Sequence, residues 1–134
     1  MYLIDTVVLS ELRKRDRNPS VVAWIEAQRT SDLFLSVITV GEIERGIERQ
    51  RPTDPAFAMA LYNWLDRLLI LYADHIVGID LSTARRWGRL SAEIGHTGAD
   101  LMIAATALEH GLAVATRNTR HFTPMGVSVL DPFS

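Results

Sequence analysis

The feature that most restricts the fold is a series of short apolar runs, separated by segments with helical periodicity. The clear runs are residues 2–4, 33–35, 76–79 and 112–115, and a weaker one covers residues 127–130. Their side chains are apolar at consecutive positions rather than at every second one, which is typical of strands covered on both faces. Strands that alternate with helices predict an α/β fold with a mostly parallel central sheet flanked by helices.

The segments between these runs have the periodicity of helices. In residues 39–50, Val40, Ile43 and Ile47 recur on one helix face. A very apolar helix is predicted over residues 99–109 and ends before Gly111, a residue suited to a helix C-terminus. The other predicted helices are residues 8–15, 20–28, 55–72 and 83–94, the last capped by Ser82. No linker or repeat interrupts the alternation, so we expect a single domain over residues 1–134.

Composition excludes several classes of protein. The 14 Lys and Arg residues against 16 Asp and Glu give a net charge of −2, so no overall positive charge indicates a nucleic-acid partner. The absence of cysteine excludes disulfides and thiolate zinc sites and is consistent with the reducing cytoplasm, where we expect the protein to lie. No apolar run approaches the ~18 residues of a membrane span. The histidines have no metal-binding spacing, and neither a P-loop nor a Gly-x-Ser-x-Gly elbow is present.

Three acidic residues lie in unusually apolar surroundings. Asp5 directly follows the first apolar run, Glu42 adjoins the apolar face of its helix, and Asp100 opens the most apolar helix. Each has an ordinary structural explanation, since Asp5 and Asp100 suit helix N-termini. Glu42 has Arg45 and Arg49 as possible partners on its own helix. The other interpretation is that the three acids converge beyond the carboxyl ends of the strands, where ligands bind in such folds. Spacing alone leaves both interpretations open.

Convergence of these acids would require a compensating charge. Two carboxylates about 5 Å apart repel by about 3 kcal/mol at an effective dielectric constant near 20. Converging acids therefore have raised pKa values or bind a cation. Carboxylate oxygens without His or Cys favour hard ions such as Mg²⁺ or Mn²⁺, which orient phosphates and activate water.

Three segments, in this order and at these distances, resemble the PIN-domain nucleases. They are residues 3–12 (LIDTVVLSEL), residues 36–46 (SVITVGEIERG), and residues 100–107 (DLMIAATA) followed by Ala115-Thr116-Arg117-Asn118. The resemblance extends from Tyr2 to Phe133 and is closest to the VapC toxins of bacterial toxin–antitoxin pairs, including their FitB-like members.

The resemblance implies a PIN-like three-layer fold in which Asp5, Glu42 and Asp100 hold Mg²⁺ or Mn²⁺. It implies a metal-dependent endoribonuclease that acts on RNA as a growth-inhibiting toxin. It also implies a homodimer and a VapB-like antitoxin that blocks the site and carries a DNA-binding domain. The alternative is a PIN-fold regulatory module with weak or no catalysis, which acts through an antitoxin that binds DNA.

The sequence departs from the family pattern at two positions. Val7 stands where the family usually has Asn or another polar residue after the Asp-Thr pair. Asn118 occupies the place where many PIN domains carry a fourth acid, so we expect it to orient water or phosphate without adding charge. These two departures favour the regulatory alternative, whereas the intact set of three acids favours the nuclease.

Several polar residues accompany the acids. Thr6 and Thr116 lie at strand ends, where their hydroxyls can hydrogen-bond the carboxylates or simply shape the turns. Thirteen of the basic residues are arginines, whose planar guanidinium groups match phosphates. Arg45, Arg49 and Arg117 lie nearest to the candidate site in the sequence, and we expect them to contact RNA.

Overall fold

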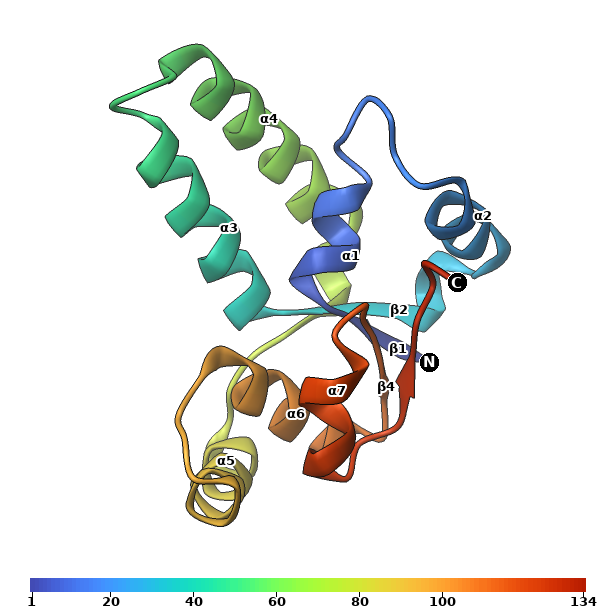
Figure 1. The fold of residues 1–134 in the computed structure, drawn as a ribbon, viewed down its shortest axis with the longest axis vertical. Coiled ribbons are helices and arrows are strands. Elements are labelled where there is room, and N and C mark those ends of the chain that lie inside the picture. Colours follow the sequence, from blue (N-terminus) through green and yellow to red (C-terminus); the bar gives the residue numbers. More distant parts are fainter.

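The computed structural model describes residues 1–134, and strands alternate with helices along most of the chain (Figure 1). The strands are β1 (Tyr2–Ile4), β2 (Leu33–Ser36), β3 (Ile76–Val77), β4 (Ala113–Ala115) and β5 (Val129–Leu130). The α-helices are α1 (Thr6–Glu11), α2 (Pro19–Ala27), α3 (Val37–Gln50), α4 (Pro55–Leu71), α5 (Leu81–Ile94), α6 (Ala99–His110) and α7 (Thr119–Phe122). Short 3₁₀ helices are η1 (Thr30–Asp32), η2 (Ala73–His75) and η3 (Thr123–Met125). None of the helices combines the length and apolar character of a membrane-spanning segment.

The five strands form one parallel sheet in the order β3-β2-β1-β4-β5. The central strand β1 pairs with β2 on one side, where Leu3 lies opposite Phe34, and with β4 on the other, where Leu3 lies opposite Val114. All carboxyl ends therefore meet at one edge of the sheet, and the turns after β1, β2 and β4 lie next to one another there. This confirms the predicted parallel α/β architecture.

Each face of the sheet carries its own apolar cluster. Leu3 and Ile4 are both completely buried but belong to different clusters, because successive side chains of a strand point to opposite faces. The cluster of Leu3 includes Leu101 and Phe122 of α6 and α7, and the cluster of Ile4 includes Ile47 of α3. In Figure 1, α1 to α4 lie on one side of the sheet and α5 to α7 on the other. Burial on both faces explains why the strands are continuously apolar.

The prediction that Ser82 caps the helix of residues 83–94 is wrong. The helix α5 begins at Leu81, and its N-cap is Asp80, whose Oδ1 accepts a hydrogen bond of 2.8 Å from the Thr83 N–H. This capping lowers the pKa of the Asp80 carboxyl. The helix predicted over residues 8–15 also differs, since α1 starts earlier, directly after Asp5, and ends at Glu11. Helix α7, a single turn too short to show apolar periodicity, was not predicted.

Candidate active site

The Asp5 carboxylate lies buried at the carboxyl end of the central strand. Its side chain caps α1, because Oδ1 accepts a hydrogen bond of 2.9 Å from the Thr6 N–H. Its Oδ2 accepts a second one, of 2.8 Å, from the Thr116 hydroxyl after β4. Only 4% of the residue is exposed. The capping role read from the sequence is therefore present, and the same carboxylate also faces the neighbouring strand end.

The electrostatics of Asp5 show that other acids are close. Burial raises the pKa of the Asp5 carboxyl to about 6, although the hydrogen bonds from Thr116 and Thr6 act in the opposite direction. Repulsion from Asp100 and from Glu42 raises this pKa further. The fold thus places Glu42 and Asp100, which are 37 or more positions away in the chain, within electrostatic range of Asp5.

Glu42 is directed towards the β1–α1 turn. Its Oε1 accepts a hydrogen bond of 2.6 Å from the Thr6 hydroxyl, which also lies 3.2 Å from the hydroxyl of Thr39. Glu42 forms no ion pair with Arg45 or Arg49, the alternative partners on its own helix. Thr39, which is completely buried in the first turn of α3, was not among the predicted site residues. Its only signal in the sequence is a hydroxyl beside the apolar face.

Asp100 has a partner that the sequence did not predict. Its Oδ2 lies 3.1 Å from Nδ1 of His121, which α7 presents to the start of α6. The other oxygen, Oδ1, makes no hydrogen bond within the protein. Because a carboxylate can only accept, the contact places a proton on Nδ1 of His121. The histidine thereby fixes one oxygen of Asp100 and leaves the other free for a ligand.

The three acids match a divalent metal in ligand type and charge. All of them supply carboxylate oxygens, as hard cations prefer, and the pKa of Asp5 is raised mainly by burial and further by Asp100 and Glu42, both of which a bound cation would offset. In their present positions the three carboxylates do not form a complete coordination site, since no three His, Asp or Glu residues are spaced to hold an ion. Glu42 is only half-buried and Asp100 keeps one oxygen free, so a metal could be coordinated after these side chains rotate.

The loop after β4 is connected to Asp5 through Thr116. The backbone N–H of Asn118 donates a hydrogen bond of 2.9 Å to the Thr116 hydroxyl, which itself donates to Asp5. The Asn118 side chain is exposed and makes no capping bond to α7. Val7, the other departure from the family pattern, packs against the apolar cluster that contains Ile4. Its position therefore has a packing role that a polar residue would not fill.

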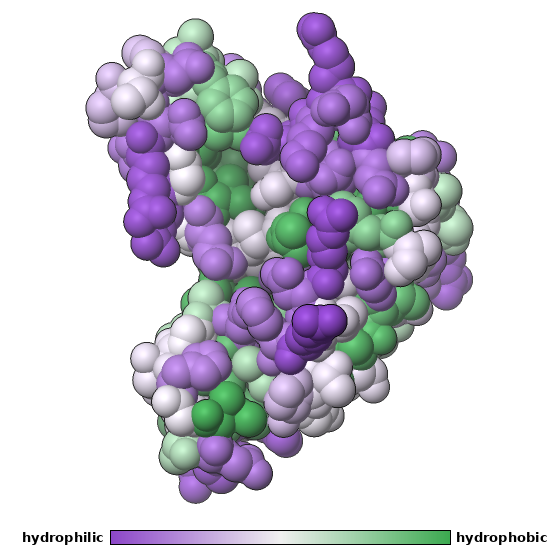
Figure 2. Space-filling view, viewed as in Figure 1, coloured by the Kyte–Doolittle hydropathy of each residue, from purple (hydrophilic) through white to green (hydrophobic).

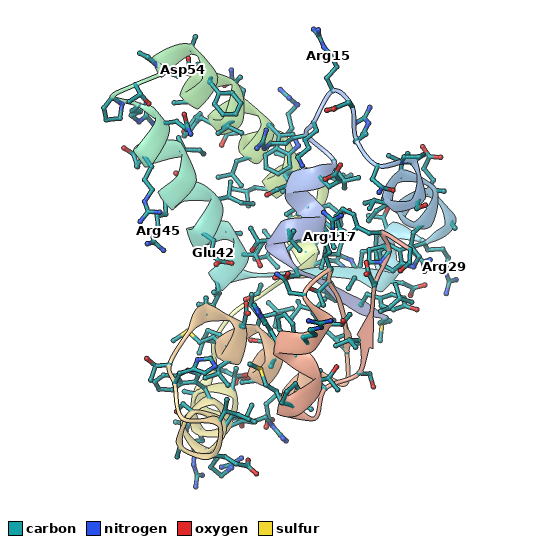
Figure 3. All side chains as sticks on the ribbon, in the orientation of Figure 1. Arg15, Arg29, Glu42, Arg45, Asp54 and Arg117 are labelled. Atoms are coloured by element: carbon teal, nitrogen blue, oxygen red, sulfur yellow. The ribbon has the colours of Figure 1, made fainter.

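The three predicted RNA-binding arginines lie at different places. Arg117 follows Thr116 and stacks over the ring of Phe133, with its guanidinium carbon 4.3 Å from the ring centre. Arg45 and Arg49 are exposed on α3 and form no ion pair. In Figure 3, Arg117 lies near the middle of the molecule, whereas Arg45 projects from the outer side of α3. Arg117 therefore adjoins the β4 end of the site, whereas Arg45 lies about one turn along α3 from Glu42.

A groove of about 180 Å³ runs from Glu42 along the α3–α4 pair. Its lining combines Thr6 and Glu42 at one end with the apolar side chains of Phe57, Leu61 and Trp64 from α4. Figure 2 shows this recess between α3 and α1, with hydrophobic atoms in its depth. The groove joins the acidic residues to an apolar surface that the chain leaves uncovered.

Comparison with known families gives a match to the family model described as PIN domain over residues 2–125. The chain is 36% identical to "Plasmid stability protein StbB" of Pseudomonas syringae pv. tomato, with 99% of each chain covered. It is 35% identical to "VapC ribonuclease Y4jK" of Sinorhizobium fredii, over 99% of this chain and 98% of the relative. It is 34% identical to "Toxin FitB" of Neisseria gonorrhoeae, over 99% of each chain.

The fold also matches solved structures. A structure of FitAB bound to an IR36 DNA fragment superimposes with a TM-score of 0.88 and 32% sequence identity, covering 100% of this chain and 96% of the other. The match extends to both apolar layers, because nearly the whole of each chain is aligned.

Proposed function

The chain belongs to the PIN domain family, and on this premise we propose that it is the toxin of a toxin–antitoxin pair and an endoribonuclease that depends on Mg²⁺ or Mn²⁺. The observation that carries the proposal is the Asp5 carboxylate, whose pKa is raised by burial and further by Asp100 and Glu42. Relatives named as a ribonuclease and as a toxin support the same activity. We also propose that residues 1–134 form a single domain.

The proposed roles follow from the contacts of each acid. Asp5 and Asp100 hold the metal, Asp5 with its orientation fixed by Thr116 and Asp100 through the oxygen that His121 leaves free. Glu42, held by the Thr6 hydroxyl, holds the metal or positions the attacking water. When bound, the ion polarises the phosphodiester, lowers the pKa of water and stabilises the leaving oxygen. Asn118 orients water or phosphate from the adjoining loop.

The remaining proposals concern partners. The apolar groove beside Glu42 suits an antitoxin segment that covers Phe57, Leu61 and Trp64 and so blocks the acids. The solved FitAB complex with DNA supports an antitoxin with a DNA-binding domain. We expect the chain itself to form a homodimer.

We propose that arginines guide the RNA towards the acids. Arg117 adjoins the site through the backbone, because it directly follows Thr116, which donates a hydrogen bond to Asp5. Its stacking on Phe133 keeps the guanidinium close to the site. Arg45 and Arg49 have no acidic partner and are free to contact the phosphates of a longer strand.

The alternative, a regulatory module without strong catalysis, is favoured by Asn118 in place of a fourth acid. The two functions are separated by incubating the purified chain with total RNA in Mn²⁺ and in EDTA. The proposed nuclease produces fragments with Mn²⁺ and none with EDTA. Intact RNA under both conditions, from a folded chain, would favour the regulatory module.

A change at Asn118 tests whether this loop faces the acids. Asn118→Asp adds a fourth negative charge, so we expect faster cleavage at millimolar Mn²⁺ and a lower melting temperature in EDTA because of like-charge repulsion. Asn118→Ala serves as the control, since it removes the amide without adding charge. Unchanged metal dependence together with unchanged stability in EDTA would place residue 118 outside the acidic site.

A further inference from the structure

A second cavity, of about 390 Å³, adjoins Asp100 and lies between the loop that follows α5 and the short helices α7 and η3. Asp100 lines this cavity but not the groove beside Glu42, and Glu42 does not line this cavity. Asp100 is therefore the point at which the cavity meets the acidic site. A ligand in this cavity would therefore lie directly beside the acidic site.

The cavity carries hydrogen-bonding and cationic groups that have no partner in the protein. The ring of His96 is held over the backbone of Gly98, whose N–H donates to Nδ1 at 3.1 Å. Because Nδ1 accepts, the neutral ring carries its proton on Nε2, which is free to donate. His121 is bonded to Asp100 through Nδ1 and likewise leaves Nε2 free. Arg120 is exposed and forms no ion pair.

The remaining lining of the cavity is apolar. Ile94 and Met125 belong to or pack against the cluster on this face of the sheet, so they form a fixed surface. An apolar surface with imidazole rings and one arginine matches an unstacked nucleobase and its phosphate, because RNA-binding proteins stack single-stranded bases on such side chains. Apart from Asp100, which is bonded to His121, the lining holds no acidic residue that would repel a phosphate.

We propose that this cavity is a nucleotide subsite that binds one unpaired nucleotide of single-stranded RNA beside the phosphate to be cleaved. Arg120 contacts the phosphate, and the rings of His96 and His121 contact the base. The subsite gives the enzyme a base preference on one side of the cut. This inference rests on the proposed function for its link to cleavage, but binding of RNA to the cavity is measurable without it.

The test uses Arg120→Ala and His96→Ala, two exposed positions that form no hydrogen bond or ion pair with Asp100. Arg29→Ala is the matched control, because Arg29 is exposed beside α2, away from the cavity (Figure 3). Binding of a short fluorescent single-stranded RNA is measured in EDTA, and cleavage ends are mapped on total RNA with Mn²⁺. We expect at least about fivefold weaker binding for each subsite variant and a relaxed preference at one position beside the cut. Arg29→Ala should leave the RNA affinity and the base preference unchanged.

Wild-type binding and preference in both subsite variants would overturn the proposal. Weaker binding with an unchanged base preference would also overturn it, since that result describes a surface phosphate contact. If the wild type cleaves no RNA, but both variants bind RNA more weakly than the wild type does, the subsite stands and the proposed hydrolysis fails.

Discussion

Asp5→Asn, Glu42→Gln and Asp100→Asn are each expected to reduce Mn²⁺-dependent RNA cleavage by more than about 100-fold and to abolish growth inhibition on expression. Residues that merely orient metal ligands commonly change activity by 10–100-fold, so loss of a ligand itself should exceed that range. Each substitution keeps the shape of the side chain while removing its charge. The measurement is the rate of cleavage of total RNA, together with growth after induction.

The control for these variants is Glu44→Gln. Glu44 lies on the same helix as Glu42, is exposed and makes no ion pair or hydrogen bond. The Glu44→Gln variant should cleave RNA at the wild-type rate. Circular dichroism establishes that every variant is folded. A folded single variant with wild-type activity would remove that acid from the proposed site.

Asp5→Asn should also stabilise the metal-free protein at neutral pH. Burial raises the pKa of the Asp5 carboxyl from its ordinary value of 3.8 to about 6 in the folded chain, so the folded state binds the proton more tightly. The protonated Asp5 carboxyl therefore stabilises the folded state fully below about pH 4, and this stabilisation is lost as the pH rises through 6. About two pKa units correspond to about 3 kcal/mol. At pH 8 in EDTA, Asp5→Asn should therefore be more stable than the wild type by up to about 3 kcal/mol.

Urea unfolding in EDTA between pH 4 and pH 8 measures this effect. The lowered pKa of Glu11 acts in the opposite direction, with stability lost as the pH falls, but it is common to both proteins and cancels in the comparison. The difference in free energy of unfolding should grow from pH 4 to pH 7 and then level off. A difference that is independent of pH would mean that Asp5 has no raised pKa in the folded protein.

The sequence predicted the parts of the fold that depend on local patterns. Leu3 and Ile4 are apolar at consecutive positions because each belongs to the apolar cluster on a different face of the sheet. This pattern is what allowed a parallel sheet to be predicted from the sequence. The cap of α5 was misread, since Asp80 and Ser82 are both good N-cap residues and only the backbone conformation distinguishes them.

The candidate site was only partly readable from the sequence. The acids stood out because Asp5 and Asp100 adjoin strongly apolar segments. Nothing local indicated that His121 contacts Asp100, because the contact depends on how a single turn of helix packs against α6. Buried hydroxyls such as Thr39 carry a similarly weak signal, since a threonine beside an apolar helix face has the same local pattern whether it packs in the core or contacts a site.

The most direct test of a metal site formed by the three acids is thermal unfolding of the wild type and of Asp100→Asn, each in EDTA and in millimolar Mn²⁺. An ion that binds only the folded state stabilises it by about 2.7 kcal/mol at a hundredfold excess over its Kd. We predict a clear rise in the melting temperature of the wild type with Mn²⁺ and a much smaller rise in Asp100→Asn. A wild-type melting temperature that is the same in Mn²⁺ and in EDTA would contradict the assignment of Asp5, Glu42 and Asp100 as a metal site.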